Sequence, residues 1–252
     1  AAIAWGLKRG STLQPWSLPV VAETWDGVLN DINGFHVKPE HVFAALDGAA
    51  SGAVAEGNVG GGTGMICYQF KCGTGTASRK IDASGGGYTV GVLVQANHGT
   101  RSQLRIAGVP VGAEIPLTPT RAGGGPQEVE EGSIIIVIAT DAPLLPNQLE
   151  RVARRAALGL GRTGATSGNG SGDIFIAFST ANQGAAAVHD VATVQMLSND
   201  RVSAVFTATV EATEEAIVNA LVAADTMKTP DGRVIEALPH DRLRGLLKKY
   251  GR

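Results

Sequence analysis

Charged residues are scarce in this chain of 252 residues: they make up 17% of the sequence, and the formal net charge is only −2. The sequence has no stripe or long run of Lys and Arg, which a surface that follows a phosphate backbone requires. No apolar run approaches the roughly 20 residues of a transmembrane helix. We therefore expect neither a nucleic-acid partner nor a membrane partner.

Cysteine is equally rare, since only Cys67 and Cys72 are present. Two cysteines do not make a disulfide framework, and no group of Cys and His residues has the spacing of a zinc site. We expect both thiols to be reduced and partly buried. The sequence predicts no metal site and no other cofactor.

The first residues, from Ala1 onward, lack the pattern of a signal peptide and lack an initiator methionine. We expect that the chain as given has a trimmed start. We also expect a cytoplasmic location, or a periplasmic one if a preceding segment carries a signal.

Glycine is abundant, with 34 residues in clusters that follow no fixed period, so neither collagen nor a solenoid is indicated. The densest run is at residues 57–64. This run has two interpretations. One is a phosphate-binding loop, although the run lacks the Gly-Lys-Ser/Thr ending and precedes a strand pattern rather than a helix. The other is a backbone that passes close to a substrate or to another strand.

Apolar spacing predicts both strands and helices, and the 44% of hydrophobic residues is enough for a substantial core. Asn199 is predicted to cap the long third helix. Residues 117–131, rich in Gly and Pro, are predicted to be a mobile surface loop. Because the strand pairs look antiparallel and the helices are interspersed, we expect an α+β layered fold. The predicted strands are 17–23, 65–70, 88–95 (antiparallel to 65–70), 104–110, 133–138 and 173–178, the last of these buried; the predicted helices begin at 39, 146, 200 and 239.

Ser133 stands at the junction of a glycine and a buried strand. Gly132 ends the flexible stretch, and a serine then opens a run of β-branched residues, which places a hydroxyl at the rigid mouth of a strand. We hypothesise that cleavage of the bond between Gly132 and Ser133 unmasks Ser133 as a nucleophile. The alternative is a serine that merely begins a strand.

The histidines do not single out a catalytic triad, and no Gly-x-Ser-x-Gly elbow is present. Among them only His98, beside Asn97 at a strand end, lies near an expected site, and we expect it to be a loop residue with satisfied hydrogen bonds. A free α-amino group on Ser133 needs no histidine, because its reference pKa of about 7.7–8 leaves a useful unprotonated fraction at neutral pH. Such an amine can accept the hydroxyl proton of its own residue. The five histidines are His36, His41, His98, His189 and His240.

Several stretches resemble the L-aminopeptidase/D-esterases and β-peptidyl aminopeptidases, a family that matures by self-cleavage. The resemblance spans nearly the whole chain from about residue 17 onward, and the family's N-terminal segment is missing. It implies a four-layer αββα sandwich of the N-terminal-nucleophile type. The stretches are PVVAET (19–24), EGNVGGGTGM (56–65), GSII (132–135), ATDAPL (139–144) and NGSGDI (169–174).

The resemblance also implies roles for individual residues. Ser133 matches the family's N-terminal nucleophile, exposed by cleavage after Gly132. Asn97 matches the amide that holds the oxyanion. Ser171 and Asp173 match a hydroxyl and an acid beside the terminal amine, although some relatives have Glu in place of this Asp. Without the resemblance, the Ser171–Asp173 pair is typical of a cap or turn.

Three further positions are expected to line the substrate site: Trp25, Gly61 and Gly62. Trp25 stands where some relatives have a tyrosine. An indole can pack and donate a hydrogen bond, but it cannot exchange a proton as a phenol can.

The predicted function is a hydrolase that releases small N-terminal residues from short peptides, amides or esters through an acyl-serine intermediate. Residues 1–252 are predicted to form one catalytic domain, cut into an α-subunit portion (1–132) and a β-subunit portion (133–252). The cut heterodimers are expected to form a homo-oligomer. The alternatives are an N-acyltransferase of the same fold, for which a threonine nucleophile is expected, and an inactive, truncated relative that binds an anionic ligand.

Overall fold

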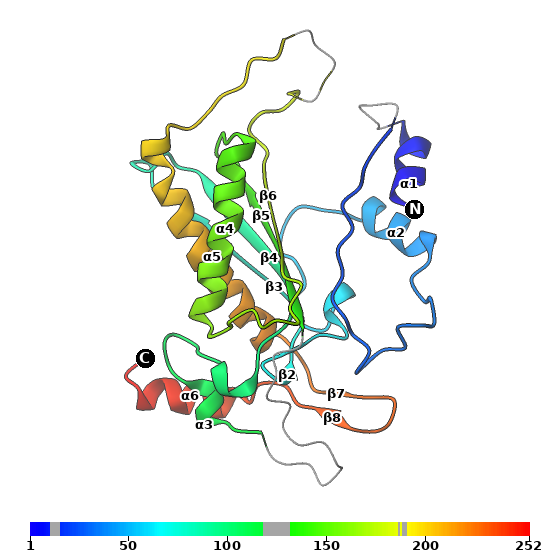
Figure 1. The fold of residues 1–252 in the computed structure, drawn as a ribbon, viewed down its shortest axis with the longest axis vertical. Coiled ribbons are helices and arrows are strands. Elements are labelled where there is room, and N and C mark those ends of the chain that lie inside the picture. The colour runs from blue at the N-terminus through cyan, green and yellow to red at the C-terminus, as the bar shows by residue number, and fades with distance from the viewer. Residues whose placement is uncertain (11–15, 118–131, 186, 188–190) are drawn as a thin grey trace.

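A four-stranded sheet lies at the centre of the computed structural model, which describes residues 1–10, 16–117, 132–185, 187 and 191–252 (Figure 1). The strands follow the order β3 (Thr74–Lys80), β4 (Thr89–Asn97), β5 (Ser133–Thr140) and β6 (Ile174–Ser179). The first three pair in antiparallel fashion, whereas β5 and β6 are parallel. A parallel pair needs a crossover. Helix α4 (Pro146–Arg162) supplies it.

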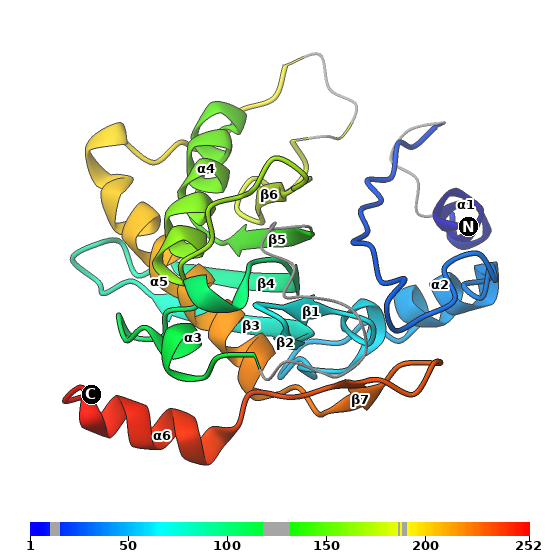
Figure 2. The ribbon, with the colours of Figure 1, turned by 60° about the horizontal axis from the view of Figure 1, so that its bottom comes forward.

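Helices α4 and α5 (Ser203–Val222) cover one face of this sheet (Figures 1 and 2). Every second residue of β4 and β5 points toward them, because strand side chains alternate between faces. Glycine permits the close packing: a Cβ atom at Gly75 of β3 would lie 2.0 Å from the Ala216 carbonyl oxygen of α5. The buried strand residues on this face are Val90, Val92, Val94, Ala96, Ile134, Ile136 and Ile138.

Smaller elements surround the end of the sheet at which β4 finishes and β5 begins. Two short strands form a hairpin, and two others form a second small sheet close to the C-terminal helix (Figure 2). The elements are the 3₁₀ turns η1 (Gly60–Gly62) and η2 (Arg101–Gln103), the hairpin β1 (Ile66–Cys67) and β2 (Phe70–Lys71), helix α3 (Val111–Glu114), strands β7 (Met227–Lys228) and β8 (Val234–Ile235), and helix α6 (His240–Lys249). A third 3₁₀ turn, η3 (Asn199–Arg201), precedes α5 at the opposite end of the sheet, where Arg201 donates to the Ser84 carbonyl of the β3–β4 loop.

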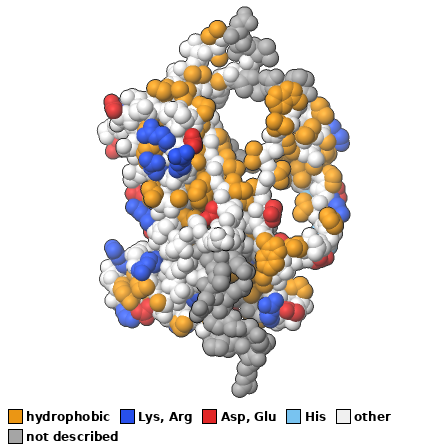
Figure 3. All heavy atoms as spheres, in the orientation of Figure 1, with side chains coloured by type: hydrophobic (Ala, Val, Ile, Leu, Met, Phe, Trp, Pro, Cys, Tyr) orange, Lys and Arg blue, Asp and Glu red, His pale blue; other side chains and the backbone are white. Residues whose placement is uncertain are grey.

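The N-terminal segment lies on the side of the sheet opposite to α4 and α5. It contains α1 (Ala2–Arg9) and α2 (Pro39–Asp47), and helix α2 begins at Pro39 as predicted. Many of its apolar side chains are exposed, as the orange atoms on the right of Figure 3 show. The sheet face on this side is also partly open, with Ile174 and Phe178 of β6 40% and 45% exposed.

The α+β composition predicted from the sequence is confirmed. The helices α4 and α5 and the sheet β3–β6 supply one α layer and one β layer. Within the described ranges, the strands outside this sheet form two-stranded pairs only.

Three of the predicted strands are wrong in extent or pairing. Residues 17–23 form no strand and are largely exposed. Residues 65–70 are broken by a turn, because Tyr68 and Gln69 both have positive φ, at 50° and 58°. Strand β4 pairs with β3 and β5 instead of with residues 65–70, and β3 is a strand that apolar spacing does not reveal. Residues 104–110 make a single bridge between Ile106 and Val109.

Other details also differ from the sequence-based expectations. Strand β6 lies at the sheet edge and is partly exposed rather than buried. Asn199 does not cap the long helix: its side-chain oxygen instead accepts hydrogen bonds from Gln148 and Arg151 of α4. The predicted helices at 146 and 239 are present as α4 and α6. The predicted loop at 117–131 lies, apart from residue 117, outside the described residues, as does His189.

Candidate active site

Ser133 is the first residue of β5, and in the antiparallel register it lies opposite Asn97, the last residue of β4. Residue 132 must be a glycine here. Its φ is +139°, and a Cβ atom on it would lie 2.2 Å from the Asn97 carbonyl oxygen. The glycine therefore lets the backbone at the bond between 132 and 133 come into close contact with the end of β4.

The loop before β6 holds Ser133 from its other side. The Gly172 N–H donates a hydrogen bond to the Ser133 hydroxyl at 2.8 Å. The Asp173 carboxylate accepts bonds from the Ile134 N–H at 3.0 Å and from the Ser171 hydroxyl at 2.6 Å. These contacts bring Ser133, Ser171 and Asp173 together, as the resemblance implies. Asp173, although shorter than Glu, reaches the start of β5.

Ser167 completes the set of contacts to this carboxylate, since its hydroxyl donates to the second oxygen of Asp173 at 2.7 Å. Sequence reasoning did not assign Ser167 to the site. The signal available was weak, because this serine lies in a small-residue loop, six positions before the aspartate. Its hydrogen bond positions the carboxylate rather than Ser133 itself.

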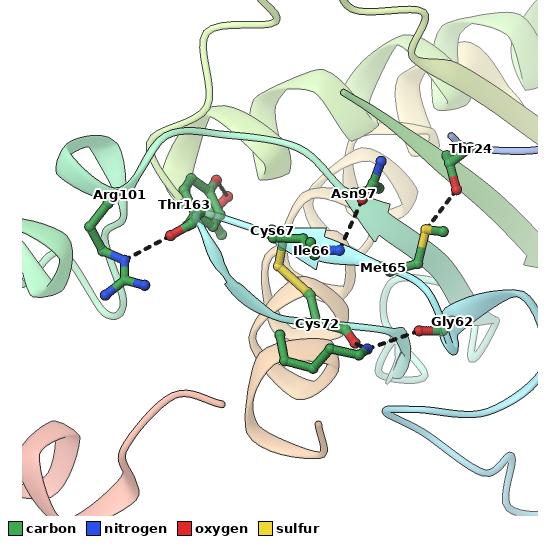
Figure 4. Close-up of a disulfide and its surroundings, with 11 residues drawn as sticks. Thr24, Gly62, Met65, Ile66, Cys67, Cys72, Asn97, Arg101 and Thr163 are labelled. Atoms are coloured by element: carbon green, nitrogen blue, oxygen red, sulfur yellow. Dashed lines mark hydrogen bonds between the residues drawn. A yellow bond between two sulfur atoms is a disulfide. The ribbon is translucent and has the colours of Figure 1, made fainter. Parts of the chain in front are cut away.

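The Asn97 side chain is 7% exposed, and the hydrogen bonds at its two ends fix the orientation of its amide. Its oxygen accepts from the Ile66 N–H at 2.9 Å (Figure 4). Its nitrogen donates to the Trp25 carbonyl at 2.8 Å. An Asn nitrogen carries two hydrogens. With one directed at Trp25, the second can donate a further hydrogen bond.

Trp25 contacts this site through its backbone, while its side chain is 58% exposed. The glycines at 61 and 62 pack beside β3 and β4. A Cβ atom at Gly61 would lie 1.9 Å from the side-chain oxygen of Gln95, and one at Gly62 would lie 2.3 Å from the Thr74 nitrogen. The glycine run thus passes close to other strands, which is the second of the two interpretations of this run, and it leads into a hairpin rather than a helix.

Gln95 is another residue that sequence reasoning missed. It lies two positions before Asn97 on β4 and hence on the same sheet face. Its side-chain nitrogen donates to the Thr24 hydroxyl at 2.7 Å. Thr24 therefore holds the side-chain amide of Gln95, and Trp25 holds that of Asn97, on the same face of the sheet. The alternation along β4 was the signal that could have identified Gln95.

His98 is buried, at 2% exposure, and neither ring nitrogen has a hydrogen-bond partner among the described residues. The prediction of a loop histidine with satisfied hydrogen bonds is therefore wrong. Burial lowers the pKa of His98 to about 4, against the opposing effect of the negative charge of Asp173. Its ring packs edge-on against Tyr68, with centroids 5.0 Å apart. A group this weakly basic is a poor general base for Ser133 at neutral pH.

The expectation of reduced, partly buried thiols is also wrong. Cys67 and Cys72 form a disulfide, and both residues are completely buried (Figure 4). Cys67 ends β1, and Cys72 directly follows β2, so the hairpin brings together two cysteines five positions apart. Spacing alone did not reveal this, because the turn between them has no typical turn sequence.

No group of three or more His, Cys, Asp and Glu side chains converges as a metal site anywhere in the described part of the chain. In the same residues, no helix combines the length and the apolar character needed to cross a membrane.

Solved structures similar to this chain include a protein of the N-terminal-nucleophile (Ntn) hydrolase fold. The L-aminopeptidase D-Ala-esterase/amidase from Ochrobactrum anthropi, described as a new variant among the Ntn hydrolase fold, matches with a TM-score of 0.86 and 49% identity. The match covers 99% of this chain and 69% of that one. A β-aminopeptidase from Burkholderia sp. matches with a TM-score of 0.88 and 47% identity over the same shares.

The sequence comparisons identify the family. The sequence model of peptidase family S58 matches residues 1–235, and the chain belongs to this family. It is 57% identical over 247 residues to the β-peptidyl aminopeptidase BapA of Sphingosinicella microcystinivorans, a match covering 94% of this chain and 62% of the relative. The corresponding protein of Sphingosinicella xenopeptidilytica is 51% identical over 246 residues, covering 92% and 60%. The chain thus spans less than two thirds of the length of these relatives.

Proposed function

We propose that this protein is a self-cleaving aminopeptidase that uses Ser133 as its nucleophile. The observation that carries the proposal is the arrangement around the start of β5. The Ser133 hydroxyl is held by Gly172, and the neighbouring Ile134 N–H is held by Asp173. The names of the relatives, β-peptidyl aminopeptidases and an L-aminopeptidase, support the same reaction class.

Self-cleavage begins with attack of the Ser133 oxygen on the carbonyl carbon of Gly132. The C–O bond forms first and gives a tetrahedral intermediate with a negatively charged oxygen; the C–N bond then breaks, and the hydroxyl proton passes to the departing nitrogen. Water then hydrolyses the ester, which leaves a Gly132 carboxylate and a Ser133 residue with both a hydroxyl and an α-amino group. The Asn97 amide stabilises the oxyanion of this step.

Turnover repeats the same chemistry on a substrate. The α-amine, with a reference pKa of about 7.7–8, accepts the hydroxyl proton and returns it to the leaving amine or alcohol. The Asp173 carboxylate orients the amine and stabilises its charged form. Water releases the acyl group from Ser133. The proposed substrates are short peptides, amides and esters with a small N-terminal residue.

The cut chain is proposed to stay together as one catalytic domain of two portions, residues 1–132 and 133–252. The pairing of β4 with β5 supports this, because it joins the two portions through consecutive residue pairs from Asn97 with Ser133 to Val90 with Thr140. We further propose that the processed heterodimers assemble into a homo-oligomer. Light scattering of the cut protein measures the mass of that assembly.

The proposed compartment differs from the cytoplasmic one expected from the sequence. The buried disulfide favours an oxidising compartment, such as the periplasm, because disulfides are rare in reducing cytosol. Labelling the native protein with a thiol reagent after denaturation tests this. Two reactive thiols per chain would contradict it.

The Ser133→Ala variant tests the mechanism. We expect intact-mass spectrometry to show a single uncut species and amide hydrolysis to be lost, because the variant has no nucleophile. Ser203→Ala, an exposed serine at the start of α5, is the matched control and should be cut normally. Cutting of the Ser133→Ala chain at 132/133, or persistent hydrolysis, would refute the mechanism. Product analysis with added amine acceptors separates hydrolysis from acyl transfer.

A further inference from the structure

The hairpin β1–β2 supplies one of the two contacts that orient Asn97. Ile66, the first residue of the hairpin, donates its backbone N–H to the side-chain oxygen of Asn97 at 2.9 Å. This bond decides which end of the amide is the acceptor. If the hairpin moved away, the amide could rotate and turn its oxygen, instead of its nitrogen, toward the oxyanion position.

This hairpin is weak on its own. It consists of only two residue pairs, Ile66 with Lys71 and Cys67 with Phe70. A short two-stranded pair is marginally stable in water. Its turn residues, Tyr68 and Gln69, both have positive φ, which is unfavourable for side chains other than glycine. Contacts from outside the strands must therefore hold its shape.

Contacts at both ends hold the hairpin, in addition to the backbone hydrogen bonds from Tyr68 to His98 and from Lys71 to Glu236, each 2.7 Å long. At the turn, the Arg101 guanidinium stacks on the Phe70 ring, 3.1 Å from its centroid, and donates to the carbonyl oxygens of Tyr68 and Gln69. At the open end, the Cys67–Cys72 disulfide joins the two strands covalently. The Cys72 N–H also donates to the Met65 carbonyl at 3.0 Å. Figure 4 shows the disulfide next to the bond between Ile66 and Asn97.

We propose that the Cys67–Cys72 disulfide is a positioning element for the oxyanion donor Asn97, an inference that rests on the proposed function. The covalent link lies one residue from Ile66, so it restrains the N–H that fixes the amide. Loss of the link leaves the open end of the hairpin to the backbone hydrogen bonds of residues 71 and 72, which restrain that N–H less than a covalent bond does. The amide then adopts, for part of the time, the flipped orientation in which its oxygen, and not its N–H, faces the oxyanion. Because the oxyanion exists only in the transition state and intermediate, kcat falls and KM does not.

The test uses Cys72→Ser and the double variant Cys67→Ala with Cys72→Ala. Steady-state kinetics on β-alanine p-nitroanilide should give a kcat lower by about tenfold to a hundredfold, expressed per cut chain, since misplacing one oxyanion donor costs that order. KM should stay within twofold. Ile217→Val, a buried change in α5, is the control for general destabilisation and should leave kcat unchanged. Equal kcat values in the cysteine variants and the control would overturn the proposal.

A second readout needs no activity. Hydrogen exchange should show at least tenfold less protection of the Ile66 amide in Cys72→Ser, with unchanged protection in the β4–β5 ladder. Unchanged protection at Ile66 overturns the proposal, as does a non-reducing peptide map with free thiols in the wild type. If the wild-type chain has the disulfide but hydrolyses no amide, the proposed function is wrong. In that case the hydrogen-exchange protection of the Ile66 amide still shows whether the disulfide restrains Ile66.

Discussion

Replacing Gly132 by alanine tests the geometry of the cleavage site. The added Cβ atom would lie 2.2 Å from the Asn97 carbonyl oxygen, about 1 Å inside the normal contact distance of roughly 3.3 Å for such a pair. A φ of +139° also suits glycine and costs other residues roughly 1–3 kcal/mol. The two strands must therefore separate by about 1 Å where Asn97 faces Ser133.

Two measurements follow this separation. Thermal unfolding should show a loss of about 2–4 kcal/mol, or roughly 5–10 °C in Tm for a chain of this size. The rate of cutting at 132/133, followed by intact-mass spectrometry, should fall about a hundredfold, because a shift of 1 Å in a reacting group costs about that much.

Gly161→Ala is the matched control. Gly161 lies in α4 with no atom within 4 Å of its added Cβ atom, so alanine should be neutral or stabilise by up to about 1 kcal/mol. Cutting at the wild-type rate in Gly132→Ala, with an unchanged Tm, would show that the close contact between Gly132 and β4 does not exist in solution.

Two further substitutions test charges in the structure. Burial lowers the pKa of Lys71 from 10.5 to about 8, so between these values the unfolded chain binds more protons and stability rises with pH. Urea unfolding should show this rise in stability for the wild type and no rise for Lys71→Met. The variant should also be more stable at pH 7 by up to about 3 kcal/mol, less the free energy of the hydrogen bonds that Lys71 makes. If the variant keeps the pH dependence, Lys71 is not its cause. Asp173→Asn should lower kcat at least tenfold and move the acid limb of the pH–rate profile to lower pH. The reason is that the α-amine of Ser133 loses the negative charge that stabilises its protonated form. An unmoved acid limb would show that the carboxylate does not affect the pKa of the amine.

The elements that apolar periodicity predicted are those whose own residues carry the pattern, such as α4 and β5. Strand β3 was missed because it reads Thr-Gly-Thr-Ala-Ser-Arg-Lys, without alternating large apolar residues. It is a strand through its pairing with β4, and Gly75 lets α5 pack closely on it; no local pattern contains either contact. The hairpin β1–β2, and with it the disulfide, was missed for a similar reason: the turn residues Tyr68 and Gln69 lack the glycine or asparagine that signals such a turn.

The sequence predicted those parts of the candidate site that are formed by side chains, but not those formed by backbone groups. Ser133 and Asp173 stand in stretches that resemble the family, Asn97 matches the family at a single position, and the structure brings the three together. The groups that orient Asn97 are the backbone N–H of Ile66 and the backbone carbonyl of Trp25. Backbone groups are present at every position, so no sequence pattern marks the ones that matter.

The contact from Trp25 to Asn97 has a consequence for variation at position 25. Because a main-chain carbonyl accepts the hydrogen bond, the orientation of the amide does not depend on which side chain residue 25 carries. The indole meanwhile stays more than half exposed. Under the proposed mechanism, position 25 can therefore change, for instance between tryptophan and tyrosine, while the Asn97 amide keeps its orientation. The main chain of residue 25 thus fixes a neighbouring amide, and its side chain independently forms an exposed surface.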